Sequence, residues 1–237
     1  MLKGFDVVYQ DNDIMVIEKP AGIVVESDKK NDVSTLENIL KKEYKIDLPR
    51  GGIVHRLDRD TSGLMVIAKN EKSLVDLQNQ FASHGVKKIY KALVFGDLEP
   101  KKGTINIALK RDPKNRTRFV VSKAKDAKEA ITHYEKVESL TLKVKTEGAT
   151  LSPILSLLRV QIETGRTHQI RAHMFAIGFP IVGDQVYKNR DSDIFSKSIG
   201  LERQFLHAEE LSFKHPTIKK TVDFKSELPD NLNKIIK

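Results

Sequence analysis

The stretch "VHRLDRDTSGLMVIAK", residues 54–69, joins a charged segment to a short apolar run. Its second half, "LMVIA" at residues 64–68, predicts a buried strand. Its first half sets Asp58 and Asp60 among a histidine and two arginines, and a Thr-Ser-Gly turn follows. The stretch therefore predicts a rigid strand end that holds carboxylates in a charged turn.

The 237 residues can bury a sizeable core and fit one large domain or two small ones. The chain lacks an uncharged apolar run of about 18 residues, so we expect no membrane span. The first residues, "MLKGFDVVYQDND", contain no apolar core of signal-peptide length and are expected to begin the fold. A cytoplasmic location is the resulting expectation.

Composition excludes some kinds of site and favours one kind of partner. The absence of cysteine rules out disulfides, thiolate zinc sites and cysteine nucleophiles. Lysine and arginine number 41 against 32 acidic residues, which gives a net charge of +9. This excess favours a polyanionic partner such as nucleic acid.

Apolar periodicity predicts a single α+β domain over residues 1–237, with a mixed, mainly antiparallel sheet flanked by helices and loops. Its helices are expected at 34–44, at 71–85 and within 164–180, and its clearest strands at 5–10, 14–20, 64–68, 88–96, 154–163, 204–213 and 221–225. A short amphipathic tail follows. The segment 140–156 has weak patterning and can hold an inserted loop.

Two helix starts carry specific capping predictions. Ser34 is expected to cap the first helix, and Glu37 stands three residues later as in a capping box. Thr167 is expected to cap the helix that carries Ile170 and Met174 on one face.

The segment from about 110 to 128 is the most basic part of the chain. One interpretation is a solvated hairpin loop, and the other is a mobile arm that grips phosphates. The net charge favours the second. Its cations are Lys110, Arg111, Lys114, Arg116, Arg118, Lys123, Lys125 and Lys128.

Several familiar catalytic patterns are missing. The run "GFPIVGD" lacks the lysine and hydroxyl of a phosphate-binding loop. His168 and His173 stand five residues apart, so they diverge by about 140° on a helix and do not form a zinc pair. Ser62 lies in a turn without the flanking glycines of a hydrolase nucleophile. We therefore expect neither a metal nor a nucleotide cofactor.

The carboxylate of Asp58 is the best remaining candidate for chemistry. Neighbouring guanidinium groups favour its ionised form, which suits a nucleophile or a base. Taken alone, "RLDRD" favours an arginine–aspartate brace that holds the turn.

Four motifs together decide between these interpretations. "HRLDRDTSG" resembles the signature of the RluA-type pseudouridine synthases, and "KKIYKALVFG", "GRTHQIRAH" and "FLHAEELSFKHP" resemble the family's later motifs in the right order. The resemblance covers residues from about 6 to about 225. It implies the pseudouridine synthase catalytic fold, isomerisation of uridine to pseudouridine in structured rRNA or tRNA, no cofactor or metal, and a monomer.

The resemblance also implies roles for individual residues. Asp58 would be the essential aspartate. Tyr90 would stack on the target uracil, and it would either act as the general base that removes the C5 proton or position that general base. Arg171 would pair with Asp58 and keep the nucleotide flipped out. Leu206 would form an apolar floor under the uracil, and Arg56 would contact RNA near the flipped nucleotide.

The expected substrate contacts extend beyond these five residues. His168, together with Gln169, is expected to orient Arg171 or the helix start more than to touch reacting atoms. The remaining RNA contacts are expected from Arg166, His168, Lys114, Arg116 and Arg118.

Three neighbours of the site are expected to have no chemical role. Asp60 is read as a turn or surface residue, because the resemblance attaches no step to it. His55 and His207 are read as structural residues of the active-site wall.

The chain also departs from the family pattern. Many relatives carry an N-terminal S4-like RNA-binding domain, whereas here the catalytic pattern begins within ten residues, so a short form without that domain is expected. RNA selection would then depend on the catalytic domain and its basic loop. Two alternatives stay open: an inactive RNA-binding or chaperone module of the same fold, and an unrelated carboxylate hydrolase.

Overall fold

The computed structural model of the chain describes residues 4–26, 35–146 and 149–237. Its contacts divide the chain into two compact units: Met1–Lys88 with Ala208–Glu227, and Ile89–His207 with Leu228–Lys237. The chain leaves the first unit within strand β4 (Lys87–Phe95) and returns to it within β12 (Leu206–Lys214). The region predicted as one domain therefore contains two units, and each is described separately below.

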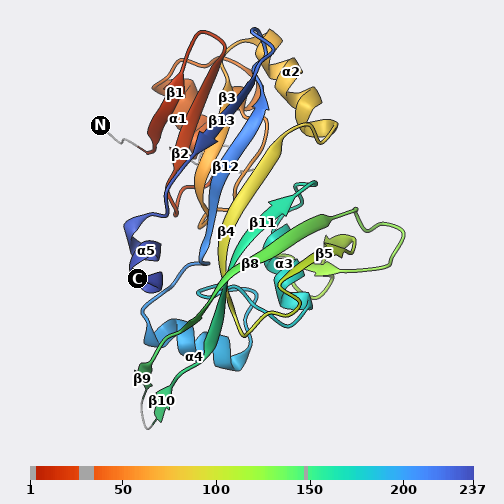
Figure 1. Ribbon diagram of the computed structural model, residues 1–237. Coiled ribbons are helices and arrows are strands. Elements are labelled where there is room, and N and C mark those ends of the chain that lie inside the picture. Colours follow the sequence, from red (N-terminus) through yellow and green to blue (C-terminus); the bar gives the residue numbers. More distant parts are fainter. Residues whose placement is uncertain (1–3, 27–34, 147–148) are drawn as a thin grey trace. The chain divides into compact units, whose positions relative to one another are not determined.

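The first unit is built on strands that come from both ends of the chain (Figure 1). Their order is β1-β2-β3-β12, and β13 pairs with β12. The β1–β2, β2–β3 and β12–β13 pairs are antiparallel. The strands not yet given bounds are β1 (Asp6–Gln10), β2 (Ile14–Lys19), β3 (Ser62–Ala68) and β13 (Thr221–Lys225).

Helix α2 (Glu71–Ala82) packs on the core of this sheet. Every residue of β3 is buried, as the apolar run predicted. Leu74 and Leu77 of α2 join one hydrophobic cluster with Leu211 and Phe213 of β12. The buried strand and the amphipathic helix that follows it are therefore confirmed.

The N-cap of helix α1 (Leu36–Lys42) lies one residue later than predicted. The N-cap is Thr35, whose hydroxyl accepts a hydrogen bond from the Asn38 backbone N–H at 3.3 Å. Ser34, the predicted cap, lies outside the described residues. The prediction was wrong because adjacent serine and threonine have the same capping chemistry, and the sequence does not choose between them. A short 3₁₀ segment, Pro49–Gly52, follows this helix.

The second unit contains an antiparallel sheet with the order β4-β11-β8-β5. Its further strands are β5 (Lys102–Asn106), β8 (Ile131–Thr141) and β11 (Ile154–Ile162), and its helices are α3 (Gln169–Ala176), α4 (Arg190–Ser198) and α5 (Asp230–Ile236). With the first unit, this arrangement confirms the predicted α+β class. None of the helices in the described ranges is long and apolar enough to span a membrane.

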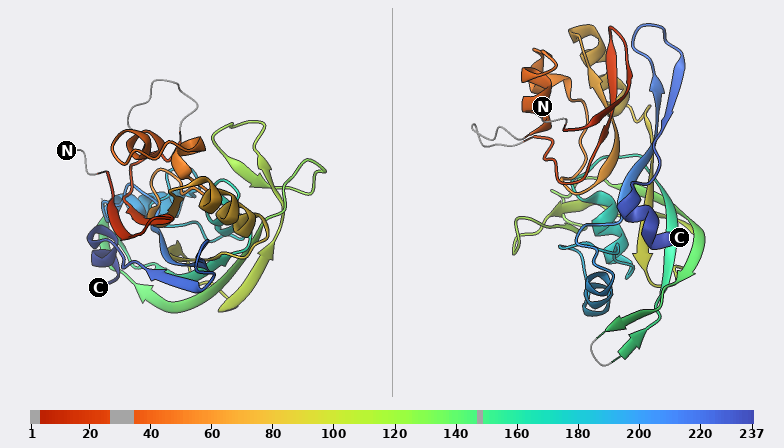
Figure 2. Two further views of the ribbon diagram at one scale, coloured as in Figure 1. Left: turned by 90° about the horizontal axis from the view of Figure 1, so that it is seen from above. Right: turned by 90° about the vertical axis from the view of Figure 1, so that its left-hand side faces the viewer.

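Two hairpins extend from the second unit. The segment 140–156, expected as an inserted loop, contains β9 (Val144–Thr146) and β10 (Ala149–Leu151), which lie beyond the ends of β8 and β11 (Figure 2). The basic segment contains β6 (Leu109–Arg111) and β7 (Phe119–Val121), which pair antiparallel. The basic segment therefore contains a short antiparallel hairpin.

Candidate active site

The loop that carries Asp58 is held by a buried lysine at the end of β2. Lys19 is fully buried, and its Nζ donates hydrogen bonds to three backbone oxygens, including that of Arg59 at 3.0 Å. The same Arg59 oxygen accepts from the Gly22 N–H at 2.8 Å. Sequence reasoning missed Lys19, although a lysine that ends an apolar strand just before Pro-Ala-Gly was a usable signal.

Asp58 stands at the start of the turn that leads into β3. Its backbone oxygen accepts a hydrogen bond from the Thr61 N–H at 3.1 Å, and its side chain is partly exposed. Gly63 has a φ of +118°, and a Cβ there would lie 2.3 Å from the Ala208 oxygen. Only glycine fits this combination of conformation and space, so the turn is fixed at both ends.

His55 is a structural residue of the same loop, as predicted. Its Nε2 accepts a hydrogen bond from the Val66 N–H at 3.0 Å, and its ring stacks on Phe81 with 4.6 Å between centroids. Burial and the positive charge of Lys88 lower the pKa of His55 to about 3, so the ring is neutral at pH 7. Burial also lowers the pKa of Lys88 to about 8.

The charged neighbours of Asp58 point to simpler roles. Arg59 pairs with the adjacent Asp60, with 3.1 Å between Nε and Oδ1, and the Arg59 side chain is 64% exposed. This geometry supports the interpretation of Asp60 as a turn residue at the surface. Arg56 is exposed, and its contact with RNA stays a prediction.

Tyr90 and Leu206 belong to the second unit. Tyr90 lies on β4 opposite Val160 of β11 and is 7% exposed, and Leu206 begins β12 and is 4% exposed. Phe205 accepts a backbone hydrogen bond from Leu93 of β4 at 3.2 Å, which places the segment before Leu206 beside β4. His207, the predicted structural neighbour, is fully buried.

The start of α3 is organised by Gln169 and not by Thr167. His168 is the N-cap residue, with a left-handed φ of 55° and no capping hydrogen bond from its side chain. The buried Gln169 amide oxygen accepts from the Thr164 hydroxyl at 2.7 Å and from the Arg166 N–H at 3.0 Å. The predicted Thr167 cap was wrong because the glutamine side chain organises the turn before the helix.

Arg171 is buried in α3 and forms a bidentate ion pair with Asp184. Its Nε lies 2.6 Å from Oδ2, and its Nη2 lies 3.0 Å from Oδ1. Sequence reasoning missed Asp184, because "GFPIVGD" was judged only as a phosphate-binding loop. Asp58 belongs to the first unit and Arg171 to the second, so the expected pairing of these two residues stays a prediction.

The predicted RNA-binding cations differ in their surroundings. Lys114 and Arg116 are exposed between β6 and β7, whereas Arg118 is half-buried. Arg166 is exposed, and its Nε donates to the Glu129 backbone oxygen at 2.9 Å. Lys114 and Arg116 are thus open to solvent in the connection between β6 and β7.

Asp11, Asp13 and His215 are close enough to suggest a cation site. The Nδ1 of His215 accepts hydrogen bonds from the Thr217 and Ile218 N–H groups, so its proton is on Nε2, which donates to Asp11 at 2.7 Å. Burial would raise the pKa of Asp11, but the hydrogen bonds that its carboxylate accepts lower it to about 2. The cluster is a hydrogen-bonded brace between two turns.

The histidine pair considered for metal binding is not a ligand pair. His173 is fully buried, with Nδ1 2.9 Å from the Thr132 hydroxyl and Nε2 2.9 Å from the Ile107 oxygen. Both ring nitrogens are therefore engaged inside the protein, while the His168 Nδ1 lies 3.2 Å from the Tyr187 hydroxyl.

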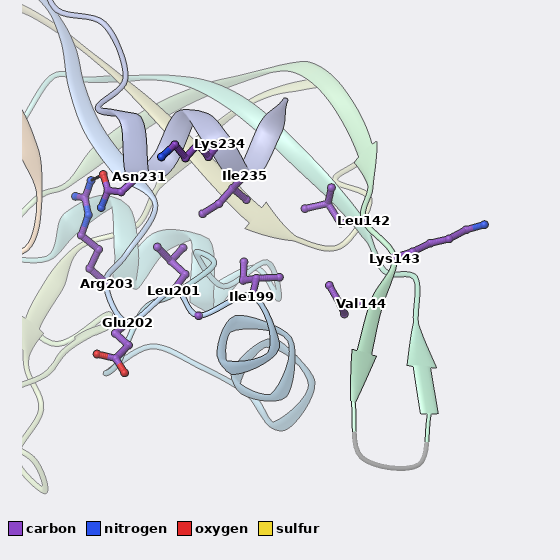
Figure 3. Close-up of a pocket in the computed structure, with 11 residues that line it drawn as sticks. Leu142, Lys143, Val144, Ile199, Leu201, Glu202, Arg203, Asn231, Lys234 and Ile235 are labelled. Carbon is purple, nitrogen blue, oxygen red and sulfur yellow. Dashed lines mark hydrogen bonds between the residues drawn. The ribbon is translucent and has the colours of Figure 1, made fainter.

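A cavity of about 620 Å³ lies in the second unit (Figure 3). Its walls come from the segment that enters β9, from the segment that follows α4 (Arg190–Ser198) and from α5. None of the predicted site residues lines it. The residues that line it are Leu142, Lys143, Val144, Ile199, Gly200, Leu201, Glu202, Arg203, Asn231, Lys234 and Ile235.

Comparison with known proteins identifies relatives that match almost the whole chain. The pattern of the family described as RNA pseudouridylate synthase matches residues 13–176. Ribosomal large subunit pseudouridine synthase D of Nitrosomonas europaea is 39% identical over 230 residues, which are 95% of this chain and 62% of that protein. The RNA pseudouridine synthase YlyB of Bacillus subtilis, named as uncharacterized, is 38% identical over 98% of this chain and 71% of its own length.

The chain thus spans less than two thirds of the Nitrosomonas protein. Among solved structures, human RNA pseudouridylate synthase domain containing 1 superposes with a TM-score of 0.74, at 24% identity, over 97% of this chain and 85% of that one. Human RNA pseudouridylate synthase domain containing 4 gives a TM-score of 0.70, at 25% identity, over 96% and 90% of the two chains. The first of these likenesses concerns the fold alone.

Proposed function

The chain belongs to the RNA pseudouridylate synthase family, and on that premise we propose that it isomerises uridine to pseudouridine in RNA. Asp58 is the proposed catalytic carboxylate. The observation that carries the proposal is the family match over residues 13–176, a range that includes Asp58, Tyr90 and Arg171.

The reaction suits a fixed carboxylate. The bond between uracil N1 and C1′ must break, the base must turn, and a C5–C1′ bond must form while the base stays bound. A carboxylate can attack C1′ or C6, or can take a proton from the sugar. The buttressed turn of Asp58 holds such a group at the end of a buried strand, where little reorganisation is needed during reaction.

The proposed contacts with the base come from the second unit. Tyr90 offers an aromatic ring to stack on uracil. Its hydroxyl can act as the general base that removes the C5 proton, or can position that general base. Leu206 provides an apolar surface under the base. Arg171 would pair with Asp58 and hold the flipped nucleotide, and Asp184 already keeps its guanidinium in one orientation.

RNA is the proposed partner, bound partly by the exposed cations of the β6–β7 hairpin and by Arg56 and Arg166. Taking a base out of a duplex costs about a few kcal/mol, and less in a loop, so a stem-loop is the favoured substrate. Phosphate contacts by the cations Lys114 and Arg116 would offset part of this cost. An RNA substrate implies a location inside the cell.

RNA of the large ribosomal subunit is the first substrate to test, because the Nitrosomonas relative is named for that subunit. Transfer RNA is the second. Mapping pseudouridine in total RNA from cells with and without the gene would identify the substrate directly.

The decisive experiment compares Asp58→Asn with Asp60→Asn. Asp58→Asn should bind RNA with unchanged affinity and release no tritium from C5-labelled uridine RNA, because the amide cannot act as nucleophile or base. Asp60→Asn is the matched control, two residues away, and should keep the rate within about twofold, as surface substitutions usually do.

Full activity of Asp58→Asn, or loss of activity only in Asp60→Asn, would contradict the proposed role of Asp58. A wild-type protein that binds these RNAs but releases no tritium from either ribosomal or transfer RNA would instead support the inactive RNA-binding module.

A further inference from the structure

The segment from Gly183 to Tyr187 joins two parts of the second unit that the proposed function uses separately. We propose that this turn is a positioning element: Asp184 fixes the guanidinium of Arg171, and Tyr187 couples the basic β6–β7 hairpin to it. The proposal rests on the proposed function. It makes Asp184 and Tyr187 positioning residues, which act through their neighbours and not on the RNA.

Asp184 is built to orient an arginine. Its side chain is fully buried, and its carboxylate accepts the two bonds from Arg171 as well as the N–H groups of Val186 at 2.8 Å and Tyr187 at 2.9 Å. A buried ion pair adds little net stability over apolar packing, so its value lies in specifying one geometry. The pair uses the Nε and Nη2 atoms of the guanidinium and so fixes which edge, that with Nη1, is turned away from Asp184.

Tyr187 lies against the same guanidinium. The Arg171 Cζ is 5.2 Å from the centre of the Tyr187 ring, and the Arg118 Cζ is also 5.2 Å from it. Arg118 lies 5.0 Å from the Phe175 ring as well. One aromatic ring therefore contacts the arginine proposed for the active site and an arginine of the basic hairpin, each within cation–π range.

The Tyr187 hydroxyl fastens the hairpin itself. It accepts a hydrogen bond from the Phe119 N–H at 2.7 Å and donates to the Phe119 oxygen at 3.0 Å. Burial raises the pKa of Tyr187, which keeps this hydroxyl protonated and able to donate. Phe119 lies in β7, and the Arg111 Cζ is 4.9 Å from the centre of its ring.

These contacts connect the β6–β7 hairpin to Arg171 through a short series of hydrogen bonds. RNA phosphates held by Lys114 and Arg116 would fix the hairpin, the hairpin is tied to the Tyr187 hydroxyl, and the backbone of Tyr187 is tied to the carboxylate that orients Arg171. Binding of RNA and placement of the arginine are thereby coupled through the turn. An error of about 1 Å in placing a catalytic group can cost about 100-fold in rate.

The test uses Asp184→Asn, Tyr187→Phe and the double variant in the full chain. Asp184→Asn keeps an acceptor for the two backbone N–H groups but presents an NH₂ group to Arg171, and Tyr187→Phe removes only the hydroxyl. Asp193→Asn and Tyr134→Phe are the matched controls, because they make the same changes elsewhere in the second unit. Single-turnover rates with saturating stem-loop RNA are compared with RNA dissociation constants.

We expect Asp184→Asn to lower the saturated rate by about 100-fold with little change in affinity. Tyr187→Phe should lower that rate and weaken binding by about fivefold, the equivalent of one hydrogen bond. Because both act through one turn, the double variant should be no slower than Asp184→Asn. A role confined to stability would lower the melting temperature of the variants and leave the saturated rate unchanged.

Hydrogen exchange gives a readout that does not depend on activity. The Phe119 amide should exchange faster in Tyr187→Phe and not in Tyr134→Phe. If Asp184→Asn does not fold, the saturated rate and the exchange of Tyr187→Phe decide the matter. Unchanged saturated rates, effects that multiply in the double variant, or unchanged Phe119 exchange would overturn the coupling. A wild-type protein without pseudouridine formation would overturn the proposed function, while faster Phe119 exchange in Tyr187→Phe would still support the hairpin link.

Discussion

At the scale of single residues, the loop that carries Asp58 depends on groups that do no chemistry. Lys19 and Gly63 fix the turn from either side, one by donating to backbone oxygens and the other by accepting a conformation closed to other residues. Asp184 does the same for Arg171. The proposed catalytic side chains thus lie in positions that are specified by buried polar neighbours.

Replacement of the buried ammonium group gives the first residue-scale prediction. Lys19→Met removes a donor to three backbone oxygens and leaves them buried, so the free energy of unfolding should fall by about 3 kcal/mol. Lys41→Met is the matched control, because Lys41 is exposed and its ion pair with Glu37 contributes about 0.5 kcal/mol or less. Urea denaturation of both variants measures this, and equal losses would contradict the role of Lys19.

The neutral ring of His55 makes stability depend on pH. Its pKa is about 3 in the folded protein and 6.5 as a model value, so between these values only the unfolded chain binds a proton at this residue. The contribution is therefore fully present above pH 6.5 and is lost as the pH falls toward 3, at no more than about 1.4 kcal/mol per pH unit.

His55→Gln should flatten this dependence, because glutamine does not titrate. Free energies of unfolding at pH 7 and pH 5 should differ less in the variant than in the wild type. His84→Asn, an exposed position where asparagine suits the left-handed backbone, should keep the wild-type slope. Parallel pH curves for His55→Gln and the wild type would show that the ring is not buried in its neutral form.

Residue identity in the candidate site was predictable from motifs, whereas the support of these residues was not. Asp58, Tyr90 and Arg171 lie within recognisable stretches. Asp184 stands 13 residues after Arg171, and only the folded structure shows that the two form an ion pair. A single aspartate in a glycine-containing turn gives no periodic or spacing signal.

At the scale of elements, the basic segment is a hairpin whose cations divide into two groups. Arg118 packs on aromatic rings at the base, whereas Lys114 and Arg116 are exposed in the connection between β6 and β7. The sequence predicted the charge but not this division. Cation–π packing depends on rings that lie more than 50 residues away, at Phe175 and Tyr187.

The exposed pair is the part of the hairpin that should bind phosphates. Lys114→Gln combined with Arg116→Gln should reduce the slope of log K against log salt by about 0.7–0.9 for each phosphate that the variant no longer neutralises. RNA binding between low and moderate salt measures the slope.

The control for the hairpin replaces two exposed lysines on α1, Lys41→Gln and Lys42→Gln, which makes the same change in net charge. That protein should keep the wild-type salt slope. An unchanged slope in the hairpin variant would return the segment to the interpretation as a solvated hairpin.

Most elements followed from periodicity, and the exceptions have physical reasons. The strand β3 and the helix α2 have apolar residues at the expected spacing and were predicted. Helix α4 was missed because only Ile194 and Phe195 are apolar in "RDSDIFSKS", and its start depends on an Asn189 capping box that uses Ser192 in place of glutamate or glutamine. Cap positions were the weakest predictions, since Thr35 competes with Ser34 at α1 and the Gln169 side chain organises the start of α3.

At the scale of the whole molecule, each of the two units is assembled from two separate segments of the chain. The first unit takes β12 and β13 from residues more than 100 positions after β3 and α2. No local pattern predicts that division, because it depends on which distant strands pair. Such non-local pairing slows folding, since a long loop must close before the paired strands can stabilise each other.

Truncation tests this discontinuous construction. A fragment of residues 1–207 lacks most of β12 and all of β13, so the first unit loses Leu211 and Phe213 from its core. Burial of each such side chain is worth about 1.5–3 kcal/mol, and a domain has only about 5–15 kcal/mol to lose. The β3 amides of this fragment should therefore exchange their hydrogens without protection.

A fragment of residues 1–227 is the control. It keeps β12 and β13 and omits only α5 and the residues next to it, which belong to the second unit, so its β3 amides should stay protected. Protection of β3 in the shorter fragment would show that the first unit folds without its C-terminal strands.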